Sequence, residues 1–341
     1  MNQPEPFKMR PTRRGFIAGA SALAAIALAG RASAQSTPGG VPPFPAPAPL
    51  PEVTAPESGP IKVTATTSLI GDLVTQIGGA RVEVETILPA NADPHEYEPA
   101  PDDIAKVEDA KAVFVHGLGL DQWVEEIIEN AGGDVTVVTV TDGIETVNRG
   151  AGEEHSEESD DGHEADPHVW FDPTKTAQMV ANIATGLTTA DPDGASDYAA
   201  RLAAYQQELT TLDEQITERI ALIPEDRRKM VTNHDALGYY ADRYGLTIVG
   251  TVIPGLDTQA EPSAKEVADL IDTIKAQGVT VIFAENTVSP TLAEQLANEA
   301  GIRVVDTLYS DSLGDENSGA ATYLEMMQSD TIKIVEALIN G

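Results

Sequence analysis

Short segments rich in β-branched residues alternate with segments of helical spacing in two separate stretches of this chain. The first stretch runs from residue 61 to about 140, and the second runs from residue 229 to 338. Such an alternation is typical of a parallel sheet that carries helices on both faces. The sequence therefore predicts an α/β protein of two lobes, each with a mainly parallel sheet flanked by helices.

The individual elements follow from the same pattern. The expected strands are 61–66, 82–88, 112–116 and 135–140 in the first lobe and 229–232, 246–252, 279–284 and 303–306 in the second. The expected helices are 69–77, 102–109 and 121–130 in the first lobe and 237–244, 264–277, 290–300 and 323–338 in the second.

One long helix is expected between the two lobes. Its residues include no glycine or proline after Gly194, and apolar side chains recur at spacings of three and four: Tyr198, Leu202, Tyr205, Leu209, Leu212 and Ile216. About 28 helical residues make a rod about 42 Å long. We therefore divide the chain into a lobe at 61–190, an interlobe helix at 191–223 and a lobe at 224–341. A coiled-coil dimer is the alternative, but one seam of fewer than about four heptads favours packing along the protein's own body.

The N-terminal residues 1–34 have the features of an export signal. Thr12-Arg13-Arg14-Gly15-Phe16-Ile17 leads into an apolar stretch that ends at Leu28, and Ala32-Ser33-Ala34 offers a small-x-small cleavage pattern. The paired arginines resemble a twin-arginine signal, and an ordinary secretory signal is the alternative. We expect cleavage after about Ala34 and a periplasmic mature chain without a membrane-inserted segment. The proline-rich stretch at 35–60 is expected to be an extended spacer with little that could pack.

The chain is strongly acidic and contains no cysteine. It has 55 Asp and Glu residues against 21 Lys and Arg residues, and its formal net charge is −34. Such a surface repels phosphate, so we expect no nucleic-acid partner, and a cationic ligand fits the charge better. An acidic surface that serves only solubility is the alternative. The absence of cysteine excludes thiolate catalysis, disulfides, cysteine-type zinc sites and a lipid-modified cysteine anchor.

Three of the six histidines stand in loops that could meet in one cleft. His95 and His234 each follow a predicted strand, and strand ends are where open α/β sheets place ligands. His95 and His168 share the triplet Asp-Pro-His, whose proline restricts the backbone and helps to hold the imidazole in one direction. Any one of these histidines alone is more often an ordinary surface or core residue. Three convergent imidazoles, however, form a nitrogen-rich metal site.

A fourth ligand would be a carboxylate or a water molecule. Asp311 follows the last predicted strand and Glu285 ends the preceding one, and spacing alone does not distinguish them. His116 ends a strand that reads as buried, and we interpret it as structural.

An acidic segment at 153–166 precedes the second Asp-Pro-His triplet. Eight of its 14 residues are acidic, and His155 and His163 are interspersed among them. The segment has almost nothing apolar to bury, so it is expected to be a flexible loop. It either captures divalent cations weakly beside the site or is only a solvated acidic surface.

Taken together, these motifs resemble the zinc- and manganese-binding cluster of solute-binding proteins that serve ABC importers, a family with lipid-anchored and adhesin-like members. The resemblance covers about residues 61–340. It rests on Pro94-His95-Glu96-Tyr97-Glu98-Pro99, the Gly117-Leu118 turn with Trp123, and the segments 166–173, 233–236, 283–286 and 309–313. The resemblance implies that His95, His168, His234 and Asp311 bind one divalent metal ion between two lobes. It also implies that Glu285 is a supporting residue rather than a ligand.

The resemblance further implies a transport function without catalysis. The protein would pass its ion to the permease and ATPase of a metal ABC importer, and we expect it to be a monomer. The lipid-bearing cysteine that is common in the family is missing, so we expect the chain to be free in the periplasm. Three imidazoles and one carboxylate favour Zn²⁺, whereas Mn²⁺ prefers more oxygen ligands but remains compatible with this set.

Two other functions are the alternatives. A zinc-dependent hydrolase would keep three protein ligands and an open water position, with Glu285 as its general base. The chain has no His-Glu-x-x-His motif or similar hydrolase signature. A binder of a non-metal solute would leave the three histidines unexplained.

Overall fold

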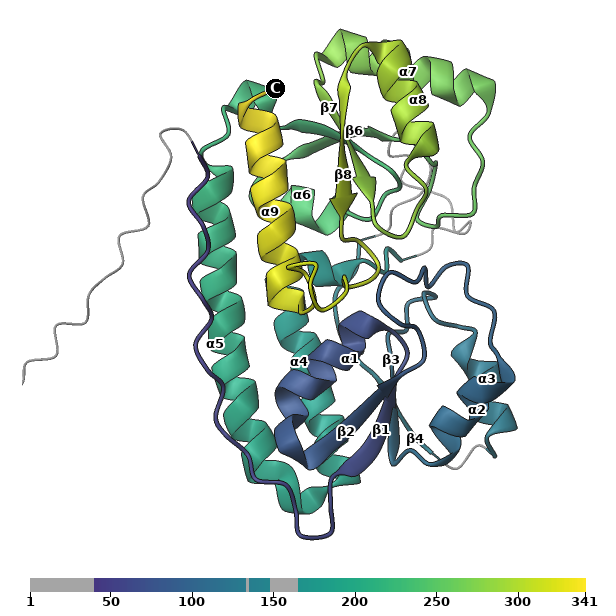
Figure 1. The fold of residues 1–341 in the computed structure, drawn as a ribbon, viewed down its shortest axis with the longest axis vertical. Helices are drawn as coiled ribbons and strands as arrows, with labels where there is room; N and C mark the ends of the chain where they lie inside the picture. Colours follow the sequence, from purple (N-terminus) through teal and green to yellow (C-terminus); the bar gives the residue numbers. More distant parts are fainter. Residues whose placement is uncertain (1–39, 133–134, 148–164) are drawn as a thin grey trace, which may run out of the picture. The chain divides into compact units, whose positions relative to one another are not determined.

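Two parallel sheets organise the part of the chain that the structure describes (Figure 1). This computed structural model describes residues 40–132, 135–147 and 165–341. The first sheet has the strand order β2-β1-β3-β4, with β1 at Ile61–Ala65, β2 at Val82–Thr86, β3 at Ala112–Val115 and β4 at Thr136–Thr139. The second has the order β6-β5-β7-β8, with β5 at Lys229–Thr232, β6 at Thr247–Thr251, β7 at Val281–Glu285 and β8 at Arg303–Leu308. The strands pair in parallel, which confirms the predicted α/β class with two mainly parallel sheets.

Helices connect the strands and cover the sheets. They are α1 (Ser68–Gly78), α2 (Pro101–Glu108), α3 (Val124–Asn130), α4 (Pro173–Ala190), α5 (Ala195–Ile220), α6 (Gly238–Tyr244), α7 (Ala264–Gln277), α8 (Thr291–Ala300) and α9 (Tyr323–Ile339). Local sequence sets where several of them begin: Thr67 and Thr322 accept backbone N–H groups at the starts of α1 and α9, and Ser263 forms a capping box at α7. Within the described ranges, no helix has the length and apolar character needed to span a membrane.

The expected long helix is α5, which has 26 residues. It contacts α1 of the first lobe and α6 of the second, and it also packs against α4 and α9. Its buried stripe consists of Tyr198, Tyr205, Leu209, Leu212 and Ile216. Because this stripe is filled by the chain's own helices, a coiled-coil partner is not needed. The helix is shorter than 191–223, because Pro192–Gly194 forms a separate 3-10 turn before it. We keep the lobe boundaries 61–190 and 224–341 as a proposal.

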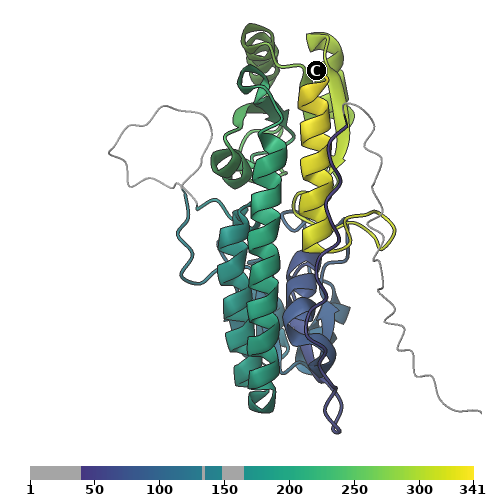
Figure 2. The same ribbon diagram turned by 90° about the vertical axis from the view of Figure 1, so that its left-hand side faces the viewer.

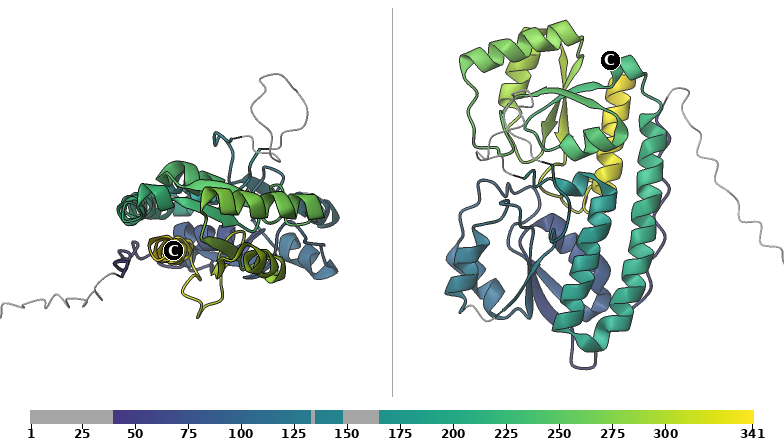
Figure 3. Two further views of the ribbon diagram at one scale, coloured as in Figure 1. Left: turned by 90° about the horizontal axis from the view of Figure 1, so that it is seen from above. Right: turned by 180° about the vertical axis from the view of Figure 1, so that it is seen from behind.

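Helix α4 was missing from the sequence prediction. It lies beside α5, as the right-hand view of Figure 3 shows, and the two helices are joined only by a short turn. The sequence does carry a start signal, since Asp172 accepts the backbone N–H of Thr174 and Pro173 occupies the first turn. The signal lies only four residues after the Asp-Pro-His triplet at 166–168, so the histidine motif masks the start of the helix.

The proline-rich stretch is not a free spacer in its described part. Residues 40–60 form no helix or strand, as expected, but residues 41–51 run alongside α5 and α9 (Figures 1 and 2). We call residues 41–51 the N-terminal strap. At one end, the strap packs the ring of Phe44 3.7 Å from the guanidinium carbon of Arg219. Arg219 also donates to the carbonyl oxygens of Pro42 and Pro43, at 3.0 and 2.8 Å.

The other end of the N-terminal strap is held by the first half of α5. The backbone N–H of Ala48 donates to Glu208, and Arg201 donates to the carbonyl oxygen of Pro51 at 2.6 Å. An extended proline-rich chain makes no internal hydrogen bonds, so its carbonyl oxygens are free to accept these donors. The strap therefore packs because α5 supplies arginines at the matching positions.

We expect the N-terminal strap to stabilise the fold through Phe44 and Arg219. Phe44→Ala should lower the free energy of unfolding by about 1–2 kcal/mol, because it removes a cation–π contact and apolar burial. The measurement is a double-mutant cycle with Arg219→Met, followed by denaturant unfolding. The two losses should be non-additive by about 0.5–1 kcal/mol, which is the coupling of the pair. Strictly additive losses would show that this contact contributes nothing.

Candidate metal centre

The four side chains expected to bind a metal lie together. His95 follows β2, His234 follows β5 and Asp311 follows β8, so each stands beyond the carboxyl end of a parallel strand. His168 comes from the turn that leads into α4. One potential ligand atom from each residue lies within 4.8 Å of the others. The structure thus brings together the histidines of both lobes and the late aspartate.

The distances within this cluster suit a shared cation. The Nε2 atoms of His168 and His234 are 3.3 Å apart, and they lie 3.3 and 3.4 Å from the two carboxylate oxygens of Asp311. Two ligands that are each about 2.0–2.1 Å from a tetrahedral zinc ion lie about 3.3–3.4 Å from each other. The Nε2 atom of His95 is buried without a hydrogen-bond partner, which is a state that a metal ion would relieve.

Carboxylates behind the imidazoles orient two of the rings. Nδ1 of His168 lies 2.8 Å from Asp166, and Nδ1 of His234 lies 2.6 Å from Glu285. A carboxylate that accepts the Nδ1 proton leaves the Nε2 lone pair for a metal and makes that nitrogen more basic. Glu285 also accepts the backbone N–H groups of Asn233 and His234. The structure therefore places Asp311 within the cluster and Glu285 behind His234.

Both Asp-Pro-His triplets form the same local turn. Asp93 accepts the backbone N–H of His95, and Asp166 accepts that of His168, each at 2.9 Å. An aspartate that binds the backbone two residues ahead is a common turn device, and the proline fixes the backbone angle between them. The repeated triplet was noted in the sequence, but the roles of its aspartates were not predicted.

Burial and charge prepare the cluster for a cation. Burial lowers the pKa of His95 to about 4, so this imidazole is neutral at neutral pH. Burial also lowers the pKa of His168, but the hydrogen bonds to Asp166 and Asp311 outweigh it and raise that pKa to about 10. Burial would raise the pKa of Asp311, yet the surrounding imidazoles hold it well below its usual range. Without a metal, the cluster therefore keeps a carboxylate charge and a proton on His168.

The remaining histidines take no part in the described cluster. His116 is buried, its Nε2 lies 2.8 Å from the carbonyl oxygen of Pro167, and its ring packs edge-on against Trp170. This placement agrees with the structural interpretation of His116. Most of the acidic segment, including His155 and His163, falls within residues 148–164, which are not among the described residues. The expected export signal at 1–34 also lies outside the described residues.

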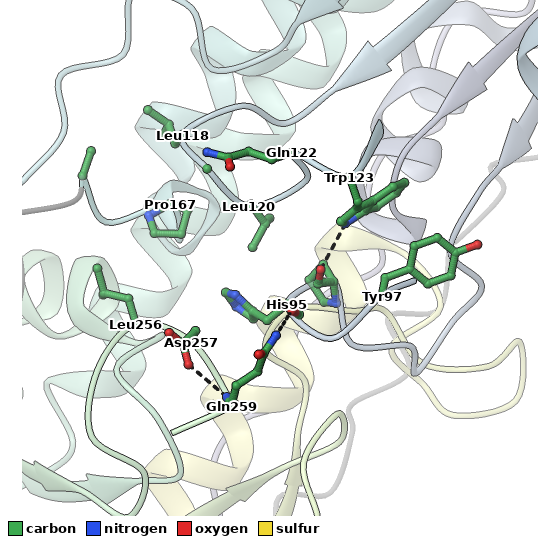
Figure 4. Close-up of a pocket in the computed structure, with 13 residues that line it drawn as sticks. His95, Tyr97, Leu118, Leu120, Gln122, Trp123, Pro167, Leu256, Asp257 and Gln259 are labelled. Atoms are coloured by element: carbon green, nitrogen blue, oxygen red, sulfur yellow. Dashed lines mark hydrogen bonds between the residues drawn. The ribbon is translucent and has the colours of Figure 1, made fainter. Parts of the chain in front are cut away.

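A pocket of about 420 Å³ opens onto the cluster at His95 (Figure 4). Its walls include Tyr97, Trp123, Gln122, Asp257 and Gln259. The three other members of the cluster do not line this pocket and are fully buried. His95 is therefore the member of the cluster that stands between the pocket and the other three.

Replacing Glu285 by Gln should weaken metal binding by about 10–100-fold, the usual effect of losing an outer partner of a ligand. The amide cannot supply the negative charge that orients and polarises His234 through Nδ1. Competitive titration against a metal indicator measures the change, with the exposed Glu294→Gln of α8 as the matched control. Wild-type affinity in the Glu285→Gln protein would show that this carboxylate does not support the site.

Comparison with known proteins gives a consistent set of relatives. The family model for the periplasmic component A of the zinc-uptake complex matches residues 63–337. The manganese-binding lipoprotein MntA of Halalkalibacterium halodurans is 34% identical over 278 residues, which cover 82% of this chain and 88% of that protein. The iron ABC transporter substrate-binding lipoprotein MtsA of Streptococcus pyogenes is 28% identical over 289 residues, with 83% and 90% covered.

Solved structures agree with this picture. The periplasmic zinc-binding protein TroA from Treponema pallidum superposes with a TM-score of 0.73 at 28% sequence identity. A manganese-bound periplasmic metal-binding protein from Candidatus Liberibacter asiaticus superposes with a TM-score of 0.71 at 27% identity. Each match covers 82% of this chain and 99% of the solved chain.

Proposed function

The chain belongs to the zinc-uptake component A family of metal-binding substrate-binding proteins of ABC transporters, and from this premise we propose that it captures one divalent transition-metal ion in the described cluster. The ligands would be His95, His168, His234 and Asp311. The observation that carries this proposal is the convergence of two Nε2 atoms and one carboxylate at 3.3–3.4 Å, beside the unpartnered Nε2 atom of His95. The family resemblance found in the sequence is confirmed.

We propose zinc as the preferred ion, with manganese as the close second. The relatives are named for zinc, manganese and iron, so their names do not decide the question. Three nitrogen ligands and one oxygen ligand favour zinc. A bidentate Asp311 would raise the coordination number and bring the site closer to the preference of manganese.

The proposed role is delivery rather than chemistry. The protein would act in the periplasm as a monomer and hand its ion to the permease and ATPase of a metal importer. Four protein ligands complete a tetrahedral shell, and a complete shell leaves no position for a reactive water molecule. Burial of three of the four ligands also suits an ion that is held for transport.

The position of Glu285 argues against the alternative in which this residue is the general base of a zinc hydrolase. Glu285 is 4% exposed; its Oε1 accepts the backbone N–H groups of Asn233 and His234, and its Oε2 lies 2.6 Å from Nδ1 of His234. A general base must reach the water that it activates, and this carboxylate lies on the far side of His234.

A competitive titration tests the proposed function. Metal-free protein is titrated with zinc and manganese against chelators of known affinity, and the bound metal is counted by elemental analysis. We expect one ion per chain and a higher affinity for zinc. A higher affinity for manganese would overturn the choice of metal, whereas the absence of tight binding for either ion would overturn the function.

A further inference from the structure

A loop of the second lobe reaches across to the segment that carries His95. This loop, residues 253–259, follows β6 and precedes α7. The hydroxyl of Thr258, which is buried, donates to the carboxylate of Asp93 at 2.7 Å. The side-chain amide of Gln259 donates to the carbonyl oxygen of His95, as the dashed line in Figure 4 marks. Both bonds therefore join residues of the second lobe to the Asp-Pro-His triplet of the first.

The same loop is anchored on the segment that carries His234. The backbone N–H of Ile253 donates to the carbonyl oxygen of Asn233 at 2.7 Å, and that of Asp235 donates to the carbonyl oxygen of Gly255 at 3.1 Å. The loop is thus a bridge between two ligand-bearing segments from different lobes. The metal cluster itself consists of His95, His168, His234 and Asp311.

The loop at 253–259 lies beside the pocket through which a bound ion would leave. His95 lines the pocket, and so do Asp257 and Gln259 of the loop (Figure 4). The other ligands are fully buried, so an ion that moves into this pocket has to pass His95. On its first-lobe side, the His95 segment is held by Trp123, whose indole N–H donates to the carbonyl oxygen of Pro94 at 3.1 Å. The segment can move aside only if its bonds to Thr258 and Gln259 break.

We propose that Thr258 and Gln259 form a latch that slows the release of the bound metal. This inference rests on the proposed function of the cluster. The two residues act through the position of His95 and are positioning residues, not ligands. Removing either hydrogen bond lowers the free energy needed to move the His95 segment away from the cluster. The latch therefore acts on the dissociation rate more than on the association rate, as most contacts of a closing loop do.

The test is a stopped-flow measurement of metal release from the full-length protein. Zinc-loaded protein is mixed with an excess of a fluorescent chelator, and association is measured separately. Thr258→Val keeps the shape of the side chain and removes its donor, while Gln259→Ala removes the second donor. Each change should speed zinc release by about two- to tenfold, the range expected for one hydrogen bond. Association should change by less than about twofold, and the protein should still hold one zinc ion.

Three further variants control this experiment. Thr273→Val on α7 and Gln295→Ala on α8 repeat the chemical changes at sites outside the loop and should release zinc at the wild-type rate. Thr258→Ser retains the hydroxyl and should restore slow release. Unchanged release in both latch variants would overturn the proposal, and so would a loss of stoichiometry or slower association, since these would place the residues in the site itself. A wild-type protein that binds no metal would instead refute the proposed function.

Discussion

The His95→Ala protein should bind zinc more than about 100-fold more weakly than the wild type and yet unfold at nearly the same denaturant concentration. Loss of an outer partner already costs about 10–100-fold in metal affinity, so loss of a ligand should cost more. His95 is the informative choice, because its Nε2 atom has no hydrogen-bond partner that the change would leave unpaired. Equilibrium titration and denaturant unfolding of the same preparation measure the two effects.

A variant of the pocket wall is the control for this loss. Gln122 lines the same pocket and is exposed, so Gln122→Ala should leave the affinity for zinc unchanged. His168→Ala, His234→Ala and Asp311→Ala should also lose affinity. The two histidine variants should in addition lose stability, because each removes the imidazole that lies against a buried carboxylate. Wild-type affinity in His95→Ala would remove this residue from the ligand set.

Metal binding should release one to two protons and should strengthen as the pH rises from about 5 to 8. In the metal-free cluster the pKa of His168 is raised to about 10, and charge from Glu285 and Asp311 outweighs burial and raises the pKa of His234. A metal needs the Nε2 lone pair that a proton occupies, so a lower pH adds competitors and weakens binding. Each displaced proton makes the affinity about tenfold weaker per unit fall in pH. His95 contributes no released proton above pH 5, because its pKa is lowered to about 4.

Calorimetric titration in buffers of different ionisation enthalpy counts these protons directly. The observed heat should change in proportion to the ionisation enthalpy of the buffer, with a slope of one to two protons per ion. A slope of zero, together with an affinity that does not change with pH, would show that the imidazoles are already unprotonated without metal.

Much of the fold could be predicted because its signals are local. The alternation of β-branched and amphipathic segments depends on neighbours in the chain, and so does the stripe that begins at Tyr198 on α5. Helix α4 was missed although its cap is local, because its first turn overlaps the motif around His168. The packing of the N-terminal strap could not be predicted, since it depends on Arg201 and Arg219, which lie far along the chain.

In the candidate site, too, some features have local sequence signals and others depend on tertiary contacts. The Asp-Pro-His triplets and the strand ends indicated three histidines, but spacing left Asp311 and Glu285 equivalent. The structure separates them: the backbone N–H groups beside His234 hold Glu285 at the end of β7, whereas Asp311 stands three residues beyond β8 and faces the imidazoles. Thr258 and Gln259 gave no sequence signal, because their roles arise only where a loop of the second lobe meets the His95 segment.

The most direct test of this account is the position of the ion itself. Crystals of the protein grown with zinc can be measured on both sides of the zinc absorption edge, so that anomalous scattering locates the metal. We predict one strong peak per chain, bonded to Nε2 of His95, His168 and His234 and to the carboxylate of Asp311. A peak elsewhere, or an ion that is bound without one of these four side chains, would contradict the account.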